Sequence, residues 1–133
     1  SIVEKETGAH DERPLIAGVF VNRLRKGMRL QTDPTVIYGL GEQFDGNLRR
    51  RDLQADTPYN SYTRAGLPPT PIALCGRAAL EAAVRPAATD ALYFVATGTG
   101  DGRHFFANSL VAHNDNVAQH LSNLRGGSGA QVR

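Results

Sequence analysis

Glu6 is the side chain of this sequence with the clearest capacity for chemistry. It lies in the stretch Ser1-Ile2-Val3-Glu4-Lys5-Glu6-Thr7, whose composition suits a helix. On a helix that turns about 100° per residue, Glu6 shares a face with Ile2 and Val3, whereas Glu4 points to the opposite side. We therefore expect a solvated Glu4, and a Glu6 whose apolar surroundings disfavour ionisation and raise its pKa. A carboxylic acid that stays protonated near neutral pH is suited to protonating a leaving-group oxygen.

Two interpretations of Glu6 are compatible with these residues. If the helix continues, the face of Glu6 extends to Ala9 and His10, and the protonated side chain serves as an acid catalyst. In the structural alternative, the carboxylate of an amphipathic helix reaches solvent or forms an ion pair with Arg23 or Arg25.

Side chains that hold metals or act as nucleophiles are sparse. Cys75 is the only cysteine, so an internal disulfide or a cysteine-based zinc site is excluded, and no base follows it closely in sequence. His10, His113 and His120 do not have the spacing of metal ligands. We therefore expect no metal and no other cofactor.

The charge pattern does not favour nucleic acid as a partner. The net charge of +2 is mild. The densest basic run, Arg49-Arg50-Arg51, is followed directly by Asp52, which predicts a solvated turn. Aromatic residues interleaved with Lys and Arg, on which bases would stack, are missing.

The length of 133 residues suits a single domain. Its longest apolar run, from Leu15 to Val21, is seven residues, too short for a membrane span. The chain has no initiator Met and begins inside a predicted helix. We therefore expect a piece of a longer protein, whose anchoring or targeting segment lies outside this chain.

Helix signals dominate the first half of the chain. Pro14 near the start and Gly27 after the last apolar residue delimit a second helix. Asp33-Pro34 predicts a third helix that ends at Gly39 or Gly41, with Asp33 as its cap. The polar segment 41–71 is typical of a functional loop region.

The second half predicts a hairpin between two helices. We expect a helix over 77–84, a strand over 92–96, its return strand over 104–106 and a final helix over 110–124. The fold class is then α+β, with helices around a small antiparallel hairpin. One domain covers residues 1–125, and residues 126–133 form a flexible tail.

Seven stretches between Ser1 and about Leu124 form a further pattern: Ser1-Ile2-Val3-Glu4-Lys5-Glu6-Thr7, Val19-Phe20-Val21-Asn22-Arg23-Leu24, Gly27 to Gly39, Tyr59-Asn60-Ser61-Tyr62, Gly66-Leu67-Pro68-Pro69, Leu92-Tyr93-Phe94-Val95 and His104-Phe105. In this order and spacing they resemble the catalytic domain of the YceG-like (MltG) endolytic murein transglycosylases. Ser61 replaces the usual Thr of its block but keeps the hydroxyl. Cys75 stands where related sequences tend to carry Pro, and neither departure weakens the resemblance.

The resemblance implies a lyase of cell wall biogenesis. Members of this family cleave the β-1,4 bond between N-acetylmuramic acid and N-acetylglucosamine in nascent peptidoglycan strands, and leave a 1,6-anhydro-muramyl end. It implies peptidoglycan glycan strands as the substrate and cell-wall synthases as further partners. It also implies a location at the periplasmic face of the bacterial inner membrane, with membrane contact only through an N-terminal segment outside this chain.

The family's catalytic glutamate falls on Glu6. Asp33, the other acidic residue in a matching block, either caps a helix or stabilises a positively charged centre. His104 is expected to contact substrate, to orient Glu6 or to make a structural hydrogen bond. Amide, hydroxyl and aromatic groups suited to N-acetylated sugars complete the expected substrate-binding set, with Asn60 and Tyr62 foremost: Gln31, Thr32, Asp33, Tyr38, Tyr59, Asn60, Tyr62 and His104.

Two other functions are compatible with the sequence. A lysozyme-like muramidase would hydrolyse the same bond, using Glu6 together with Asp33. A non-catalytic peptidoglycan-binding module would hold glycan strands without cutting them.

Overall fold

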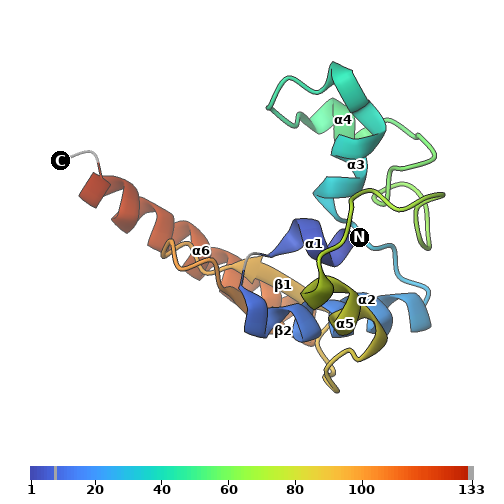
Figure 1. The fold of residues 1–133 in the computed structure, drawn as a ribbon. Coiled ribbons are helices and arrows are strands. Elements are labelled where there is room, and N and C mark those ends of the chain that lie inside the picture. The colour runs from blue at the N-terminus through green and yellow to red at the C-terminus, as the bar shows by residue number, and fades with distance from the viewer. Residues whose placement is uncertain (8, 132–133) are drawn as a thin grey trace.

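The computed structural model describes residues 1–7 and 9–131, with side chains as far as Gly126. Its helices and strands follow one another along the chain (Figure 1) as α1 (Ile2–Glu6), a 3-10 turn (His10–Glu12), α2 (Arg13–Arg25), α3 (Asp33–Leu40), a second 3-10 turn (Gly41–Gln43), α4 (Arg50–Gln54), α5 (Arg77–Val84), β1 (Tyr93–Ala96), β2 (His104–Ala107) and α6 (Leu110–Gln131). The predicted α+β class is confirmed, because the described part is mostly helical and contains one two-stranded antiparallel sheet.

Helix α2 forms the centre of the hydrophobic core. Pro14 lies in its first turn, where the missing N–H costs no hydrogen bond. Gly27, with φ of 70°, ends the helix in the left-handed region that glycine adopts without strain. Ile16 and Val19 on its buried face have no exposed surface. The core cluster joins this helix to residues of α1, α5 and the connecting segments: Ile2, Val3, Ile16, Ala17, Phe20, Leu30, Ile72, Ala79 and Ala82.

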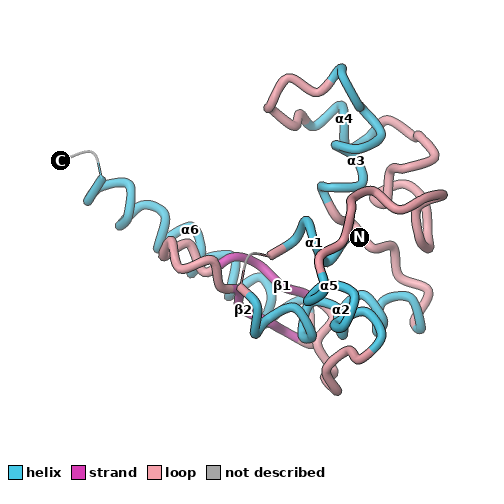
Figure 2. The backbone as a smooth tube through the Cα atoms, in the orientation of Figure 1, coloured by secondary structure: helices cyan, strands magenta, loops and turns pink. Residues whose placement is uncertain are grey.

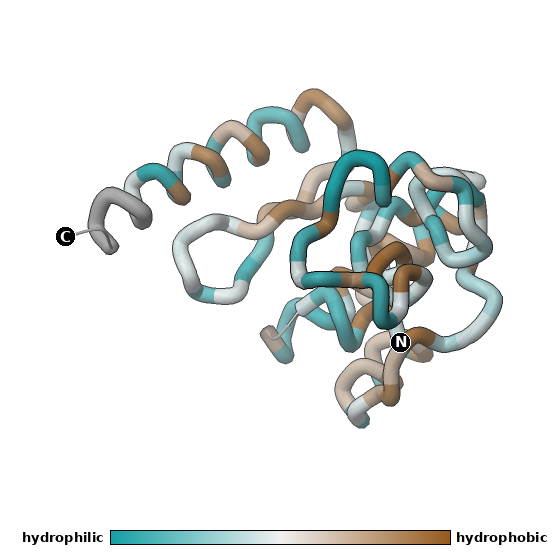
Figure 3. Tube along the Cα trace, turned by 90° about the horizontal axis from the view of Figure 1, so that it is seen from above, coloured by the Kyte–Doolittle hydropathy of each residue, from teal (hydrophilic) through white to brown (hydrophobic). Residues whose placement is uncertain are grey.

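The hairpin and α6 form a second layer. Strands β1 and β2 pair in register from Tyr93 opposite Ala107 to Ala96 opposite His104. Helix α6 contacts both strands, and Figures 1 and 3 show its C-terminal part extending away from the rest of the molecule. Along this helix, Leu110, Val111, Leu121 and Leu124 are exposed. Among the described residues, no helix combines the length and the apolar character needed to cross a membrane.

Helices α3 and α4 lie together at the end of the molecule that is opposite the C-terminal part of α6, and long loops join them to the core (Figure 2). The loop region predicted over 41–71 also contains short helical segments. The solvated turn predicted at Arg49–Arg51 is wrong, because α4 begins at Arg50. The backbone N–H of Arg49 donates to Asp52 Oδ2 at 2.9 Å, which closes the first turn of this helix.

Most of the predicted elements are confirmed within a residue or two, namely the helices now seen as α2, α3 and α5 and the hairpin of β1 and β2. The continuation of the first helix to Ala9 and His10 is wrong. Helix α1 ends at Glu6, Thr7 is extended, and the Thr7 hydroxyl accepts a hydrogen bond from the N–H of Ala9 at 3.0 Å. A hydroxyl that binds the backbone two residues on favours a turn over a further helical turn.

The C-terminal helix is longer than its sequence pattern indicated. Helix α6 runs to Gln131, so the helical backbone passes the expected boundary at residue 125. Residues 132 and 133 lie outside the described part. The flexibility of residues 126–133 stays a prediction.

Close packing of α2 against the segment after α5 predicts the effect of a small substitution. A Cβ added at Gly18 would lie 2.7 Å from Thr89 Cγ2 and 2.8 Å from the carbonyl oxygen of Ala87. We expect Gly18→Ala to reduce the free energy of unfolding by about 1–2 kcal/mol, because overpacking outweighs the better helix propensity of alanine. Urea unfolding would measure this loss. Gly126→Ala in α6, where an added Cβ meets nothing within 4 Å, is the control, and an equal loss there would refute the packing explanation.

Candidate active site

A cavity of about 430 Å³ opens where α1, α2, the start of α3, β1 and α6 meet. Its apolar lining comes from Phe20, Leu30, Phe94, Val95 and Leu110. Its polar and aromatic lining comes from Glu6, Arg23, Gln31, Thr32, Asp33, Tyr62, Tyr93 and His113. A hollow that combines apolar and aromatic walls with converging polar groups is suited to binding a small molecule or a sugar.

Glu6 is the last residue of α1, and its half-buried carboxyl lines this cavity. Oε1 accepts a short hydrogen bond from the Thr32 hydroxyl. Burial raises the pKa of Glu6, and the negative charge of Asp33 raises it further. The Thr32 hydrogen bond and His104 act in the opposite direction and lower this pKa. The net effect is a raised pKa, as the helical pattern predicted.

The structural alternative for Glu6 is wrong where it predicts an ion pair with Arg23 or Arg25. Within the described part of the chain, no ion pair joins Glu6 to Arg23 or Arg25. The prediction of a merely solvated Glu4 is also wrong. Its Oε1 accepts a hydrogen bond from the N–H of Gly76 at 2.6 Å, and its Oε2 lies 3.9 Å from Arg13 Nη2. Glu4 therefore links α1 to the start of α5.

Thr32 is held in place by a buried hydroxyl network. The N–H of Thr32 donates to Ser61 Oγ at 3.0 Å. The hydroxyls of Thr35 and Ser61 lie 2.7 Å apart, and Thr35 Oγ1 donates to the carbonyl of Thr32 at 2.8 Å. These bonds occupy the backbone of Thr32 and leave its hydroxyl directed at Glu6.

Gln31 precedes this network in a strained conformation. Its φ of 52° is the only positive value at a non-glycine residue of the described part. Its N–H donates to the carbonyl of Ser61 at 3.2 Å, which helps to hold the strained backbone in place. Strained residues of this kind concentrate at functional sites.

Asp33 and Tyr62 form the second polar contact of the cavity. The Tyr62 hydroxyl donates a short hydrogen bond to Asp33 Oδ1. Burial raises the pKa of Tyr62, and the neighbouring Asp33 carboxylate raises it further. The prediction that Asp33 caps the third helix is wrong, because the N-cap position of α3 belongs to Thr32 and Asp33 is the first helical residue. Its carboxylate is instead available at the cavity.

Four residues of the expected substrate-binding set thus surround Glu6: Gln31, Thr32, Asp33 and Tyr62. Tyr38, Tyr59 and Asn60 do not line this cavity. The rings of Tyr38 and Tyr59 pack against each other with centroids 5.0 Å apart. The Tyr59 hydroxyl lies 2.8 Å from Thr70 Oγ1, outside the site.

Asn60 has no exposed surface, and its side chain organises the loop between α4 and Tyr62. Its Nδ2 donates to the carbonyls of Leu53 at 3.0 Å and Ala55 at 2.7 Å. Its Oδ1 accepts from the N–H of Tyr62 at 2.8 Å. The amide hydrogen bonds of Asn60 are thus committed to backbone groups, and one of them positions Tyr62.

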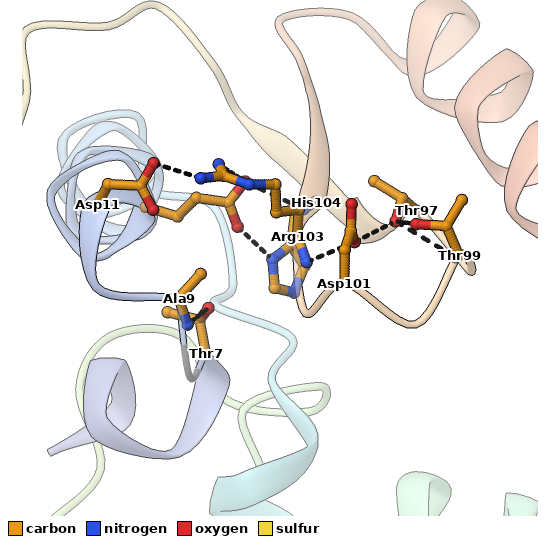
Figure 4. A network of polar contacts seen from close by, with 9 residues as sticks. Thr7, Ala9, Asp11, Thr97, Thr99, Asp101, Arg103 and His104 are labelled. Atoms are coloured by element: carbon orange, nitrogen blue, oxygen red, sulfur yellow. Dashed lines mark hydrogen bonds and ion pairs between the residues drawn. The ribbon is translucent and has the colours of Figure 1, made fainter.

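His104 lies next to the site but not on the cavity surface. Its Nδ1 is 2.9 Å from Glu12 Oε1, and its backbone N–H donates to Glu12 Oε2 at 3.1 Å. Figure 4 shows His104 next to Arg103 in the middle of a group of polar contacts, in which Arg103 binds Asp11 on one side and Asp101 binds Thr97 on the other. Glu12 therefore fixes both the backbone and the ring of a residue that influences Glu6.

Glu12 is a residue that sequence reasoning missed. It is only 4% exposed, whereas glutamates are rarely buried unless they are paired. The missed signal is its spacing, because Glu12 precedes Ile16 by one helical turn and so shares the buried face of α2.

No metal site is evident in the described part of the chain. No group of three or more His, Cys, Asp or Glu side chains there is arranged to hold an ion.

Comparisons with known proteins agree on one family. Residues 1–119 match the model of a family described as the YceG-like family. The chain is 44% identical over 122 residues to the endolytic murein transglycosylase of Bacillus subtilis, and the match covers 92% of this chain and 33% of that protein. It is 38% identical over 126 residues to the endolytic murein transglycosylase of Streptococcus pneumoniae strain D39, covering 92% of this chain and 23% of that protein.

A solved structure agrees with the sequence matches. A crystal structure of a yceG-like protein from Listeria monocytogenes has a TM-score of 0.79 and 49% sequence identity, covering 86% of this chain and 37% of that one. The chain spans about a quarter to a third of the length of the curated relatives that it matches.

The Thr32 hydrogen bond predicts a measurable change in Glu6. Thr32→Val keeps the shape of the side chain but removes the hydroxyl that favours the ionised carboxylate, so the pKa of Glu6 should rise further. Titration of the Glu6 carboxyl carbon by NMR would measure the change. Thr70→Val removes an exposed hydroxyl outside the site and serves as the control. An unchanged Glu6 pKa in Thr32→Val would show that the hydrogen bond is unimportant.

The buried hydrogen bonds of Asn60 predict that its substitution lowers the free energy of unfolding. Asn60→Ala leaves a cavity and several buried backbone groups without partners, so we expect a loss of about 2–4 kcal/mol in the free energy of unfolding. Chemical unfolding would measure it, with the exposed Asn47 mutated to alanine as the control. A loss below 0.5 kcal/mol, about the level typical of surface changes, would argue against the structural role.

Proposed function

Because this chain belongs to the YceG-like family, we propose that it carries the catalytic site of an endolytic murein transglycosylase, with Glu6 as its acid and base. The observation that carries the proposal is the position of Glu6. Its carboxyl lines a cavity of about 430 Å³ and has a raised pKa. The relatives that bear this activity in their names are 38–44% identical to this chain.

In the first step, protonated Glu6 donates its proton to the oxygen of the β-1,4 bond between N-acetylmuramic acid and N-acetylglucosamine. The C1–oxygen bond of the muramic acid breaks, and an oxocarbenium-like centre develops at C1. Burial supports this step, because it keeps a proton on Glu6 at higher pH than an exposed glutamate would hold it.

In the second step, the Glu6 carboxylate takes the proton of the muramic acid's own C6 hydroxyl. The C6 oxygen attacks C1 and closes a 1,6-anhydro ring, so the proton returns to Glu6 and no water is consumed. The Thr32 hydrogen bond supports the interval between the two steps, since it stabilises the carboxylate formed by the first transfer. Opposing effects of burial and hydrogen bonding suit a group that must give and then recover a proton.

Other residues of the cavity suit the substrate. Gln31, Thr32 and Tyr62 bring amide and hydroxyl groups to the surface that holds Glu6, and these groups match the hydrogen-bonding capacity of N-acetylated sugars. Asp33 is the group best suited to stabilising the positive centre, because its carboxylate lies on the same cavity.

The position of Asp33 also favours one second candidate. A muramidase would use Glu6 as acid and Asp33 to support attack by water, giving a reducing muramic acid end. A non-catalytic binding module gains no support from the Glu6 environment, since sugar binding alone does not require a carboxyl of raised pKa.

The cellular setting is part of the proposal. The relatives extend well beyond the matched region, so the whole protein would include segments outside this chain. We place it at the periplasmic face of the inner membrane, held there by such a segment, with nascent glycan strands as substrate and cell-wall synthases as partners.

Product analysis tests the function. The full-length protein should release glycan fragments with 1,6-anhydro-muramic ends, detected by mass spectrometry. Glu6→Gln should lower the rate by at least about 100-fold, because amides do not transfer the proton. Glu42→Gln neutralises an exposed carboxylate outside the cavity and is the matched control. Reducing ends, heavier by about 18 Da for the added water, would replace the lytic mechanism with hydrolysis, and full activity of Glu6→Gln would overturn both.

A stability measurement separates lost chemistry from lost folding in Glu6→Gln. The pKa of Glu6 in the folded protein is raised above its ordinary value of 4.5, so ionisation of Glu6 costs stability as pH rises past that value. Glu6→Gln removes this cost. Its melting temperature should equal or exceed that of the wild type near neutral pH, and the difference should shrink as pH falls below 4.5.

A further inference from the structure

Arg23 is a buried cation on the same cavity as Glu6. It lies near the end of α2, is 7% exposed and lines the cavity. Nε donates to the carbonyl of Leu92 at 2.6 Å, and Nη1 donates to the carbonyl of Arg29 at 2.8 Å. The guanidinium lies 5.0 Å from the centre of the Tyr93 ring. These contacts fix its orientation through neutral groups.

The guanidinium has no anionic partner among the described residues. None of their ion pairs includes Arg23. Its hydrogen bonds within the described part use Nε and Nη1, and none uses Nη2. A buried charge of this kind is costly unless an opposite charge accompanies it. Burial accordingly lowers the pKa of Arg23.

His113 shares this part of the cavity. It comes from α6, and its ring stacks on Tyr93 with centroids 5.0 Å apart. Its Nδ1 is buried and has no hydrogen-bond partner among the described residues. Burial lowers the pKa of His113, and the positive charge of Arg23 lowers it further. The Arg23 guanidinium and the His113 ring thus lie at one wall of the cavity without an anionic partner among the described residues.

Only one type of group on the proposed substrate matches this wall. The sugar rings and N-acetyl groups of a glycan strand are neutral. Its anionic groups are carboxylates: those of the peptide, which is joined to the lactyl group of muramic acid through an amide, or the lactyl carboxylate itself where no peptide is attached. A guanidinium with a free edge binds a carboxylate through charge-assisted hydrogen bonds.

We propose that Arg23, with His113 beside it, binds a carboxylate of the muramic acid substituent while Glu6 acts on the glycosidic bond. This inference rests on the proposed function and adds a specificity determinant to it. The bound carboxylate compensates the buried charge of Arg23 and fixes the register of the strand, so that a muramic acid, and not a glucosamine, presents its C1 to Glu6.

The first experiment uses the wild-type protein and three glycan substrates: peptide-bearing strands, the same strands with all carboxyl groups converted to amides, and strands stripped of peptide that keep only the lactyl carboxylate. Loss of a charge-assisted contact should lower kcat/KM on the amidated strands by about tenfold or more. Retained activity on stripped strands shows that the lactyl carboxylate freed there can occupy the site, and lost activity there assigns the site to a carboxylate of the peptide. Equal kcat/KM on amidated and unmodified strands overturns the inference.

The second experiment connects this preference to Arg23. Arg23→Lys keeps a charge but loses the planar fork, and Arg23→Gln loses both. Each should raise KM on carboxylate-bearing strands by a larger factor than KM on amidated strands, so the substrate preference disappears. Arg25→Gln, an exposed position on the same helix, should keep the full preference. An Arg23 variant that folds and keeps the preference refutes the assignment.

A third variant covers the case in which Arg23 substitutions prevent folding. His113→Gln changes a partly exposed residue of α6 and should weaken the same preference several-fold, whereas His10→Gln on the far surface should not. An unchanged preference in His113→Gln counts against the site. Cutting that depends on Glu6 but ignores the substrate's carboxylates would overturn this inference alone and leave the proposed function standing.

Discussion

The hydrogen bond between the Thr32 hydroxyl and the Glu6 carboxyl is the interaction on which the site depends. Burial alone would leave Glu6 as a poorly ionised acid, and full exposure would make it an ordinary surface carboxylate. The structure sets one effect against the other: burial raises the pKa, and Thr32 partly offsets the rise. A catalytic group that alternates between its two protonation states needs both states to be accessible.

The surrounding fold maintains this single contact. Thr32 is separated from Glu6 by 26 positions in the sequence, and a further 29 positions separate it from Ser61, which binds its N–H. The strained Gln31 and the N-terminus of α3 fix the direction of the Thr32 side chain. Asn60 does the same for Tyr62, through bonds that lie outside the cavity. Ser61 and Asn60 therefore support the site without lining its cavity.

Two charged side chains, Glu12 and Arg23, are buried in this fold and have different kinds of partners. Glu12 is satisfied by the backbone and ring of His104. Arg23 is held by carbonyl oxygens and an aromatic face, with no carboxylate among the described residues. The difference is informative, since a buried charge that faces a cavity without an opposite charge is suited to binding an anion there.

Local pattern was enough to predict much of this protein. Proline and glycine positions marked α2 and α3, and a short continuous apolar run marked the first strand of the hairpin. Helical geometry placed Glu6 beside Ile2 and Val3. All of these depend on neighbours a few residues away. Seven blocks in register pointed to the family, which the comparisons confirm. Packing between distant segments decided the rest. It ended α1 at Glu6, took Asn60 out of the cleft, moved Asp33 from a helix cap to Tyr62, and brought Thr32, Arg23 and His113 to one cavity. No spacing along the chain encodes these contacts, because each depends on how helices and loops from different parts of the sequence fill the same space.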